Sequence, residues 1–261
     1  MTASRVGGGR ALSADDLRTL LRGVAGLLAG APGDGRERGV QRIGDGCALA
    51  AERAPPDPAL LHADDLRLAG GFSARRGEQF LLGRAAANRA LAALGVAGAV
   101  GRGPAGAPRW PAGWTGSISH GGATAVAIVL RVGAGPVGVD LEPVRSRDVA
   151  ELVEHVLSAG EWARLADACG GPELAFHVGF STKEAVVKAI LPLAPPPRDF
   201  REIALDDVRR DGPAAVACRW RVAGLAGIAH CVAAGEAVCA LAVHAAAHGT
   251  PSPDDDPARR R

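Results

Sequence analysis

The chain has 261 residues, of which 48% are hydrophobic, and its formal net charge is +2. This composition is typical of a soluble globular protein, and the length is sufficient to bury a large core. The small charge excludes the strong electrostatic field of a typical nucleic-acid or membrane-surface binder. Because neither a signal-peptide pattern nor a bilayer-length apolar run is present, we expect no nucleic-acid partner, no membrane association and a cytoplasmic location.

Two residue types are distributed in an informative way. The five cysteines are scattered without a CxxC pair, which predicts reduced core thiols rather than disulfides. The basic residues are nearly all arginine, and the only lysines are Lys183 and Lys188. Since arginine supplies positive charge almost everywhere else, two lysines five residues apart favour positions that need a compact ammonium. Chance placement is the alternative.

The N-terminal half is predicted to contain two long helices. Ser13 with Asp16 resembles a capping box and opens a helix over residues 13–28 with a regular apolar face. A loop follows over residues 30–39. A second helix is predicted over residues 74–94 and is ended by Gly95. Five residues are expected to form its buried side: Phe80, Leu81, Ala87, Leu91 and Leu94.

The remaining elements alternate between strands and helices. Ile118, residues 123–132 and residues 137–141 are apolar and rich in β-branched residues, which predicts strands. Ser158 with Glu161 forms a second capping box, opening a helix to about residue 168. Another helix is predicted over residues 173–191, and short strands separated by glycine turns over residues 217–244.

This order predicts an α+β fold, because strands followed by helices occur once before and once after about residue 136. We expect residues 12–135 to form a first half of the domain and residues 136–247 a second, similar half. The two ends, residues 1–11 and 248–261, are rich in Gly, Arg, Pro and Asp and are predicted to be disordered.

The short strand at 137–141 leads into two carboxylates, Asp140 and Glu142. Side chains alternate along a strand, so both point to one face, where they repel unless a cation lies between them. Mg²⁺ binds such pairs and completes its shell with water and substrate phosphate. Taken alone, the pattern is weak, and a solvated strand end is the simpler interpretation.

The helix at 173–191 carries a second charged pattern. Phe180, Glu184 and Lys188 follow one another at helical spacing and share one face. An ordinary surface ion pair is the simpler interpretation. However, the stripe continues from an aromatic core residue, and buried charges are costly unless they serve a site. Ser119 and His120, between a loop and a strand, form a third and weaker candidate for phosphate binding.

In this order and spacing, the patterns resemble the Sfp-type 4′-phosphopantetheinyl transferases, in particular the branch of enterobactin synthetase component D and its actinobacterial relatives. Four segments carry the resemblance: residues 75–84 (RRGEQFLLGR), 108–120 (PRWPAGWTGSISH), 138–142 (GVDLE) and 180–188 (FSTKEAVVK). It covers roughly residues 12–245. Three positions depart from the pattern, each by lacking a charge that is common there: Gln79, Asn88 and Ala105.

The resemblance implies a fold and an activity. The two halves would be related by a pseudo-two-fold axis, with the active site between them. The enzyme would be a monomer that transfers the 4′-phosphopantetheine arm of coenzyme A to a serine of an apo acyl or peptidyl carrier protein, releasing 3′,5′-ADP. Mg²⁺ would be required, with Mn²⁺ as an alternative. Such carrier proteins serve fatty-acid, polyketide or nonribosomal-peptide synthesis.

The resemblance also implies roles for single residues. Asp140, Glu142 and Glu184 would hold the metal ion. Glu184 and Lys188 would be catalytic, Glu184 as general base, metal ligand or both. Six residues would contact phosphate groups of coenzyme A: Arg76, Arg84, Ser119, His120, Lys183 and Lys188. Two other classes of protein remain alternatives: a non-catalytic coenzyme A-binding or scaffold protein, and a Mg²⁺-dependent phosphohydrolase that uses water as nucleophile.

Overall fold

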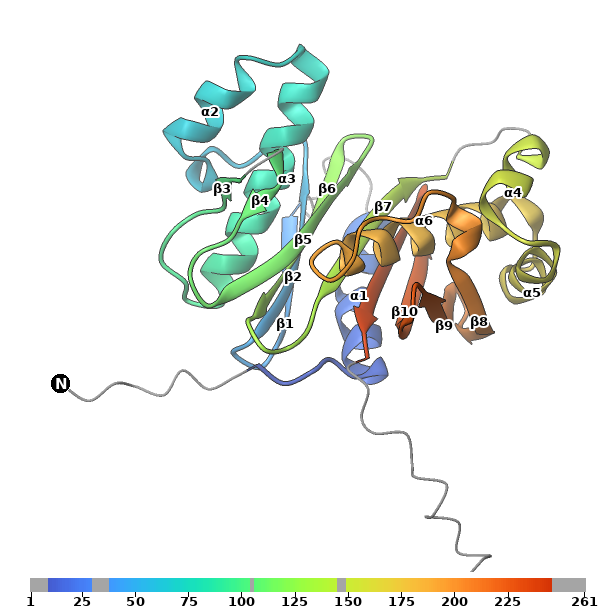
Figure 1. Ribbon diagram of the computed structural model, residues 1–261. Helices are drawn as coiled ribbons and strands as arrows, with labels where there is room; N and C mark the ends of the chain where they lie inside the picture. The colour runs from blue at the N-terminus through green and yellow to red at the C-terminus, as the bar shows by residue number, and fades with distance from the viewer. Residues whose placement is uncertain (1–8, 30–37, 104–105, 145–148, 246–261) are drawn as a thin grey trace, which may run out of the picture.

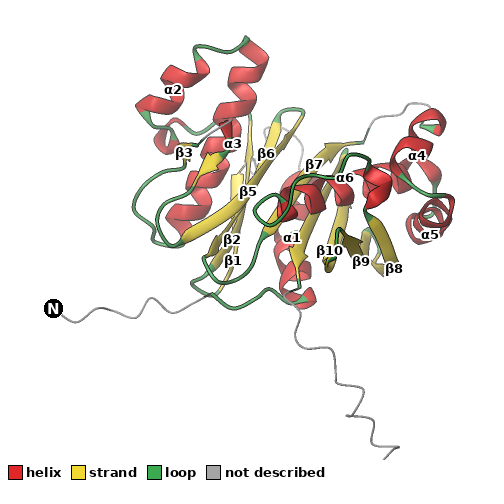
Figure 2. Ribbon diagram, viewed as in Figure 1, coloured by secondary structure: helices red, strands yellow, loops and turns green. Residues whose placement is uncertain are grey.

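The computed structural model describes residues 9–29, 38–103, 106–144 and 149–245. These residues form two large antiparallel sheets with helices packed against them, and a small two-stranded sheet (Figure 1). The predicted α+β class is confirmed. A four-stranded sheet has the order β1-β2-β6-β5, and a five-stranded sheet has the order β7-β11-β10-β9-β8. In Figure 2 the helices lie beside the sheets. The predicted pseudo-two-fold relation stays a prediction.

The first half contains the four-stranded sheet. Its elements are α1 (Ala14–Ala29), β1 (Arg38–Ile43), β2 (Cys47–Arg53), the 3-10 turn η1 (Pro58–Leu60), α2 (Ala63–Ala69), α3 (Ala74–Ala93), β3 (Gly101–Arg102), β4 (Pro108–Arg109), β5 (Trp114–Gly121) and β6 (Thr124–Arg131).

The second half contains the five-stranded sheet. Its elements are β7 (Val137–Pro143), α4 (Ala150–Val156), α5 (Ala159–Cys169), α6 (Pro172–Ile190), the 3-10 turn η3 (Phe200–Glu202), β8 (Ala204–Gly212), β9 (Ala215–Val222), β10 (Leu225–Ala234) and β11 (Ala237–His244).

Both predicted capping boxes are present. The Ser13 N–H donates to the Asp16 carboxylate at 2.8 Å, and Asp16 N–H donates to Ser13 Oγ at 3.2 Å, so α1 begins at Ala14 as expected. Ser158 and Glu161 pair in the same way at the start of α5. Residues 9–11 differ from the prediction of disorder, because Gly9 N–H donates to Val132 O and Arg10 pairs with Asp16. Residues 1–8, 30–37 and 246–261, as well as Ala105, lie outside the described residues.

Helix α1 lies in the angle between the two sheets (Figure 1). Its buried side chains, which include Leu17, Leu20 and Val24, share one core cluster with residues of both sheets. Separate clusters form where α3 covers the four-stranded sheet and where α5 and α6 cover the five-stranded sheet. The core around α1 therefore joins the two halves and leaves the opposite side of β7 free to pack against α6.

The thiol prediction is confirmed, because all five cysteines are free and four of them are buried. Burial raises the pKa of the Cys47 and Cys218 thiols to about 12. Such thiols stay protonated near neutral pH and are poor nucleophiles, which makes them packing residues.

Several elements differ from the sequence expectation. The hairpin β1–β2 and helices α2 and α4 were not predicted, and β8 begins at Ala204 rather than near residue 217. Strand β2 escaped notice because its run Cys-Ala-Leu-Ala-Ala has little β-propensity; it is a strand because it is buried between β1 and β6.

The buried side of α3 was also predicted slightly out of phase. Leu82 is 1% exposed and faces the core, whereas Phe80 and Leu81 are only partly buried. The Phe80 ring packs on Phe72, with the two centroids 5.5 Å apart, and lies beneath the guanidinium of Arg84. The residues that cover this end of the helix thus differ from those that an average helical period indicates.

Candidate active site

The carboxylates of β7 face helix α6. Val139 and Leu141 point into the core around α1, so the alternating Asp140 and Glu142 point to the other side of the strand. Asp140 is 6% exposed, and the Glu142 side chain is 22% exposed. The predicted placement of both carboxylates on one face of a strand is confirmed.

Gly138 brings β7 into direct contact with α6. A Cβ atom at this position would lie 1.8 Å from the carbonyl oxygen of Ala185 and 2.7 Å from the amide nitrogen of Ala189. Any side chain would therefore push the strand and the helix apart. Two residues along from this contact, Asp140 comes within reach of the side chains of α6.

Lys188 is the α6 residue that meets Asp140. Its Nζ lies 2.6 Å from Asp140 Oδ1, 3.0 Å from Ser119 Oγ and 3.2 Å from the carbonyl oxygen of Val139. Its side chain remains 26% exposed, so the ammonium is partly open to a ligand. The contact between Lys188 and Asp140 thus brings the predicted helix motif and the predicted strand motif together.

Glu184 lies one turn before Lys188 and is half-buried. Burial raises the pKa of its carboxyl above the usual range; Lys188 opposes this shift, and the nearby charges of Asp140 and Glu142 add to it. Glu184 lies four residues before Lys188 on α6, and Lys188 pairs with Asp140, two residues before Glu142 on β7. The structure thus gathers Asp140, Glu142, Glu184 and Lys188 at one site.

Oxygen donors of this kind fit a hard divalent cation. Among the described residues, no three side chains are arranged as a ready-made metal cluster. Mg²⁺ seldom needs one, since it usually takes one or two carboxylates and fills its shell with water and substrate phosphate. The donor chemistry of Asp140, Glu142 and Glu184 therefore suits Mg²⁺ or Mn²⁺.

Lys183 is not part of this site, which corrects the prediction that it contacts the pyrophosphate of a bound nucleotide. Its side chain is 0% exposed, and its ammonium donates to Val156 O at 2.9 Å, Glu161 Oε2 at 3.0 Å and Phe200 O at 3.1 Å. Burial lowers its pKa, while Glu161 acts in the opposite direction. All three donors of the ammonium are used inside the protein.

Arg76 and His120 form a second group, in which α3 meets β5. Arg76 Nη1 lies 3.2 Å from His120 Nε2. Burial lowers the pKa of His120, and the Arg76 charge lowers it further, so the neutral ring that can accept this hydrogen bond is favoured. Arg76 itself is exposed. The two residues offer a cation and an imidazole next to each other, on the side of β5 that faces α3.

Arg84 lies about two turns further along α3 and is 3% exposed. Its guanidinium is 4.9 Å from the centroid of the Phe80 ring, and its Nε is 3.6 Å from Asp65 Oδ1. Burial lowers its pKa. Its Nη1 has no hydrogen-bond partner among the described residues. A phosphate contact by Arg84 stays a prediction.

Ser119 lies against Asp140 and Lys188, and its predicted contact with a nucleotide phosphate stays a prediction. It is 7% exposed, and its hydroxyl donates to Asp140 Oδ1 at 2.9 Å. Sequence reasoning also missed His177, which is fully buried with Nδ1 3.6 Å from Glu142 Oε1. The available signal was its position seven residues before Glu184, which places both on one face of α6.

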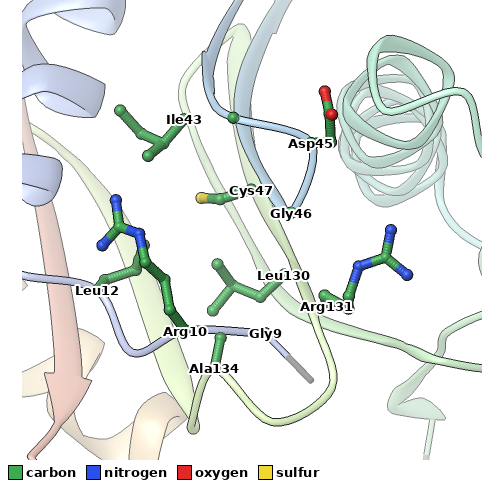
Figure 3. Close-up of a pocket in the computed structure, with 11 residues that line it drawn as sticks. Gly9, Arg10, Leu12, Ile43, Asp45, Gly46, Cys47, Leu130, Arg131 and Ala134 are labelled. Carbon is green, nitrogen blue, oxygen red and sulfur yellow. The ribbon is translucent and has the colours of Figure 1, made fainter. Parts of the chain in front are cut away.

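A surface pocket with a volume of about 350 Å³ lies elsewhere, between the N-terminal segment and strands β2 and β6 (Figure 3). Arg10 lines it, but this guanidinium is held by Asp16. None of the predicted site residues contributes to this pocket. It is therefore separate from the site formed by Asp140, Glu142, Glu184 and Lys188.

None of the described helices is long and apolar enough to cross a membrane.

Comparison with known proteins gives two matches to family models. Residues 66–130 match the 4′-phosphopantetheinyl transferase N-terminal domain, and residues 136–242 match the 4′-phosphopantetheinyl transferase superfamily. The second match contains Asp140, Glu142, Glu184 and Lys188, and the first contains Arg76 and His120. The two matched segments meet at the charged site, where Ser119 of the first contacts Asp140 and Lys188 of the second.

Individual relatives have related names. Enterobactin synthase component D of Escherichia coli O157:H7 is 41% identical over 116 residues, 44% of this chain and 55% of the relative. The protein of that name from Salmonella typhimurium LT2 is 38% identical over 131 residues, 50% of this chain and 53% of the relative. These matches span about half the length of each relative. 4′-Phosphopantetheinyl transferase Npt of Nocardia iowensis is 32% identical over 170 residues, 61% of this chain and 72% of the relative.

Proposed function

The chain belongs to the 4′-phosphopantetheinyl transferase superfamily, and we propose that it transfers the 4′-phosphopantetheine arm of coenzyme A to a serine of an apo carrier protein. One observation supports this more than any other. Asp140 of a strand pairs with Lys188 of a helix at a partly exposed position, and Glu184 lies one helical turn before Lys188. Carboxylates for a metal beside an ammonium for phosphate are the groups that this transfer needs.

The reaction exchanges one phosphorus–oxygen bond for another. The serine oxygen forms a bond to the β-phosphorus of coenzyme A, and the bond from that phosphorus to the bridging oxygen breaks, so that 3′,5′-ADP leaves. The serine proton passes to Glu184 or to water. Lys188 donates to a phosphate oxygen as negative charge increases there. When bound, Mg²⁺ supplies positive charge to the same pyrophosphate oxygens.

Different residues of this chain would bind the metal ion and the nucleotide. Asp140, Glu142 and Glu184 would hold the metal, and the β7–α6 contact at Gly138 keeps their elements together. Arg76 and His120 would bind the 3′-phosphate end of the nucleotide, with Arg84 as a further phosphate contact. The two groups lie on opposite faces of β5: Arg76 and His120 on the face toward α3, and Asp140 and Lys188 on the face toward β7.

The partner is an acyl or peptidyl carrier protein. The name enterobactin synthase component D links relatives of this chain to the assembly of a siderophore. We propose that this chain also activates carrier domains of a polyketide or nonribosomal-peptide assembly line. The cytoplasmic location and monomeric state stay predictions; size-exclusion chromatography with light scattering tests the latter.

Mass spectrometry of the carrier tests the proposal directly. The protein is incubated with coenzyme A, Mg²⁺ and several apo-carrier proteins. The expected result is a mass increase equal to one phosphopantetheine group on the carrier serine. Hydrolysis of coenzyme A without carrier modification would instead support a phosphohydrolase, and binding without either product would support a non-catalytic protein.

Asp140→Ala should abolish this transfer in a folded protein, because it removes one metal ligand and the partner of Lys188. Asp45→Ala is the matched control, since that carboxylate is 92% exposed in the β1–β2 turn. Near-normal turnover of Asp140→Ala would contradict the assignment.

The nucleotide end is tested separately. His120→Ala and Arg76→Ala should raise KM for coenzyme A more than they lower kcat, because a phosphate contact away from the reacting atoms binds the ground state and the transition state alike. A lower kcat at unchanged KM would place both residues elsewhere.

A further inference from the structure

Two serines of β5 connect the two halves of the protein. Ser117 Oγ accepts a hydrogen bond from Val139 N–H at 3.1 Å. Two residues later, Ser119 Oγ donates to Asp140 Oδ1 at 2.9 Å and accepts from Lys188 Nζ at 3.0 Å. Both serines are 7% exposed. Since they are two apart in a strand, they point to the same face, toward β7.

His120 points to the opposite face of β5. The strand alternates, so Ile118 and His120 face α3, where a Cβ on Gly83 would meet Ile118 and where Arg76 contacts the imidazole. Ser119 and His120 are neighbours in sequence but belong to different groups in space. His120 belongs with Arg76, and Ser119 belongs with Asp140 and Lys188.

The hydroxyl of Ser119 is already engaged on both sides. A serine has one donor and two acceptor positions, and here the donor is used by a carboxylate and one acceptor by an ammonium. Both partners are charged, and a hydrogen bond to a charged group is stronger than one between neutral groups. To reach a nucleotide phosphate, the hydroxyl would have to turn its only proton away from Asp140.

We infer that Ser119 is a positioning residue for Asp140 and Lys188 rather than a contact to the nucleotide. This inference rests on the proposed transfer activity. The described hydrogen bonds to the Asp140 side chain, from Ser119 and from Lys188, both fall on Oδ1. Ser119 therefore fixes the rotation of the carboxylate, so that Oδ2 would be left for a metal ion, and its lone pair holds the Lys188 ammonium beside Asp140.

A substrate comparison separates the two roles. Ser119→Ala is assayed with coenzyme A and with 3′-dephospho-coenzyme A. A positioning role predicts that kcat falls tenfold to a hundredfold, a range of about the size of a charge-assisted hydrogen bond, and by the same factor with both substrates. His120→Ala is the control: its effect should largely disappear with 3′-dephospho-coenzyme A, because the group that it binds is missing.

Three further variants and a binding measurement make the test independent of turnover. Ser117→Ala, at the same burial on the same face, should lower thermal stability about as much as Ser119→Ala but change kcat by no more than about threefold. Ser119→Thr keeps the hydroxyl and should restore part of kcat. In titrations with Mn²⁺ alone, Ser119→Ala should bind about tenfold more weakly than the parent protein, with Asp140→Ala as the reference for complete loss.

The inference is overturned if Ser119→Ala raises KM for coenzyme A and its effect vanishes with 3′-dephospho-coenzyme A. It is also overturned if Mn²⁺ binds to Ser119→Ala as tightly as to the parent. If the parent protein modifies no carrier, the proposed function fails, but the Mn²⁺ titration still tests the positioning role.

Discussion

Helix α6 carries the only two lysines of the chain, and its two faces use them in opposite ways. Lys183 and Lys188 are five residues apart, which is about 140° around the helix axis. The Lys183 side chain is 0% exposed and its ammonium is enclosed by oxygens of α4, α5 and η3. The Lys188 side chain is 26% exposed and lies at the charged site.

The comparison teaches why an arginine-rich chain keeps lysine at both positions. Each ammonium contacts three oxygens within 3.2 Å in a narrow space, which a planar guanidinium fork does not match. The same physical demand serves stability on one face and chemistry on the other. Scarcity of a residue type therefore indicates geometric need, and it does not indicate catalysis.

The largest effect on stability is expected from Lys183→Met. Glu161 would remain buried without its cation, which should lower the free energy of unfolding by about 3–5 kcal/mol. Urea denaturation monitored by circular dichroism measures this. Turnover per folded molecule should stay close to that of the parent, and its loss would return Lys183 to the active site.

A double variant isolates the pair. Lys183→Met/Glu161→Gln removes both charges and should be more stable than Lys183→Met alone, because no uncompensated buried charge remains. A lower free energy of unfolding for the double variant than for Lys183→Met would contradict this. Loss of packing, rather than an unpaired charge, would then explain the loss of stability.

In contrast to Lys183→Met, Lys188→Arg should change turnover strongly and stability little. We expect turnover to fall about a hundredfold, or roughly 3 kcal/mol of transition-state stabilisation, because the larger guanidinium does not fit between Ser119, Val139 O and Asp140. The free energy of unfolding should change by less than about 1 kcal/mol, since the side chain is partly exposed. Steady-state kinetics check this, and turnover within a few-fold of the parent would show that only the charge matters.

Gly138→Ala should affect both properties through the distance between β7 and α6. The added Cβ would meet Ala185 O at 1.8 Å, and relieving this overlap should cost about 1–3 kcal/mol of stability and lower turnover. Gly171→Ala, at the start of the same helix, is the matched control because its Cβ would meet nothing within 4 Å. Equal losses in the two variants would contradict a specific role for the close approach.

The smallest effect concerns His230, a buried ionisable group of β10 that faces α1 and β8. His230 faces Asp211, Arg18 and Arg209; burial lowers its pKa, and Asp211 opposes this less strongly than burial acts. Because the folded protein disfavours the charged ring, stability should fall as the pH drops below about 6.5, where the unfolded chain binds the proton. In His230→Gln the melting temperature should depend less on pH between pH 7 and pH 5. An unchanged pH dependence would exclude this histidine as the cause.

Local signals in the sequence predicted much of the fold. The two capping boxes marked the starts of α1 and α5, and helical periodicity located α3 and α6 to within one or two residues. Strand β2 escaped detection because its alanines become a strand only through pairing with β1 and β6. Its neighbour β6 is separated from it by about seventy residues of chain, beyond the reach of any local pattern.

By itself, the sequence determined the chemical set of the site: two carboxylates on one strand face, and a carboxylate and an ammonium one turn apart on a helix. Only the tertiary structure decided which lysine belongs to it and where Ser119 points. Helix α6 is buried around most of its circumference, so its periodicity does not distinguish a face toward β7 from a face toward α5. The oxygens that select each ammonium come from residues 17 to 69 positions away, and they are assembled only by the tertiary fold; of these residues, Ser119 alone belongs to the first half.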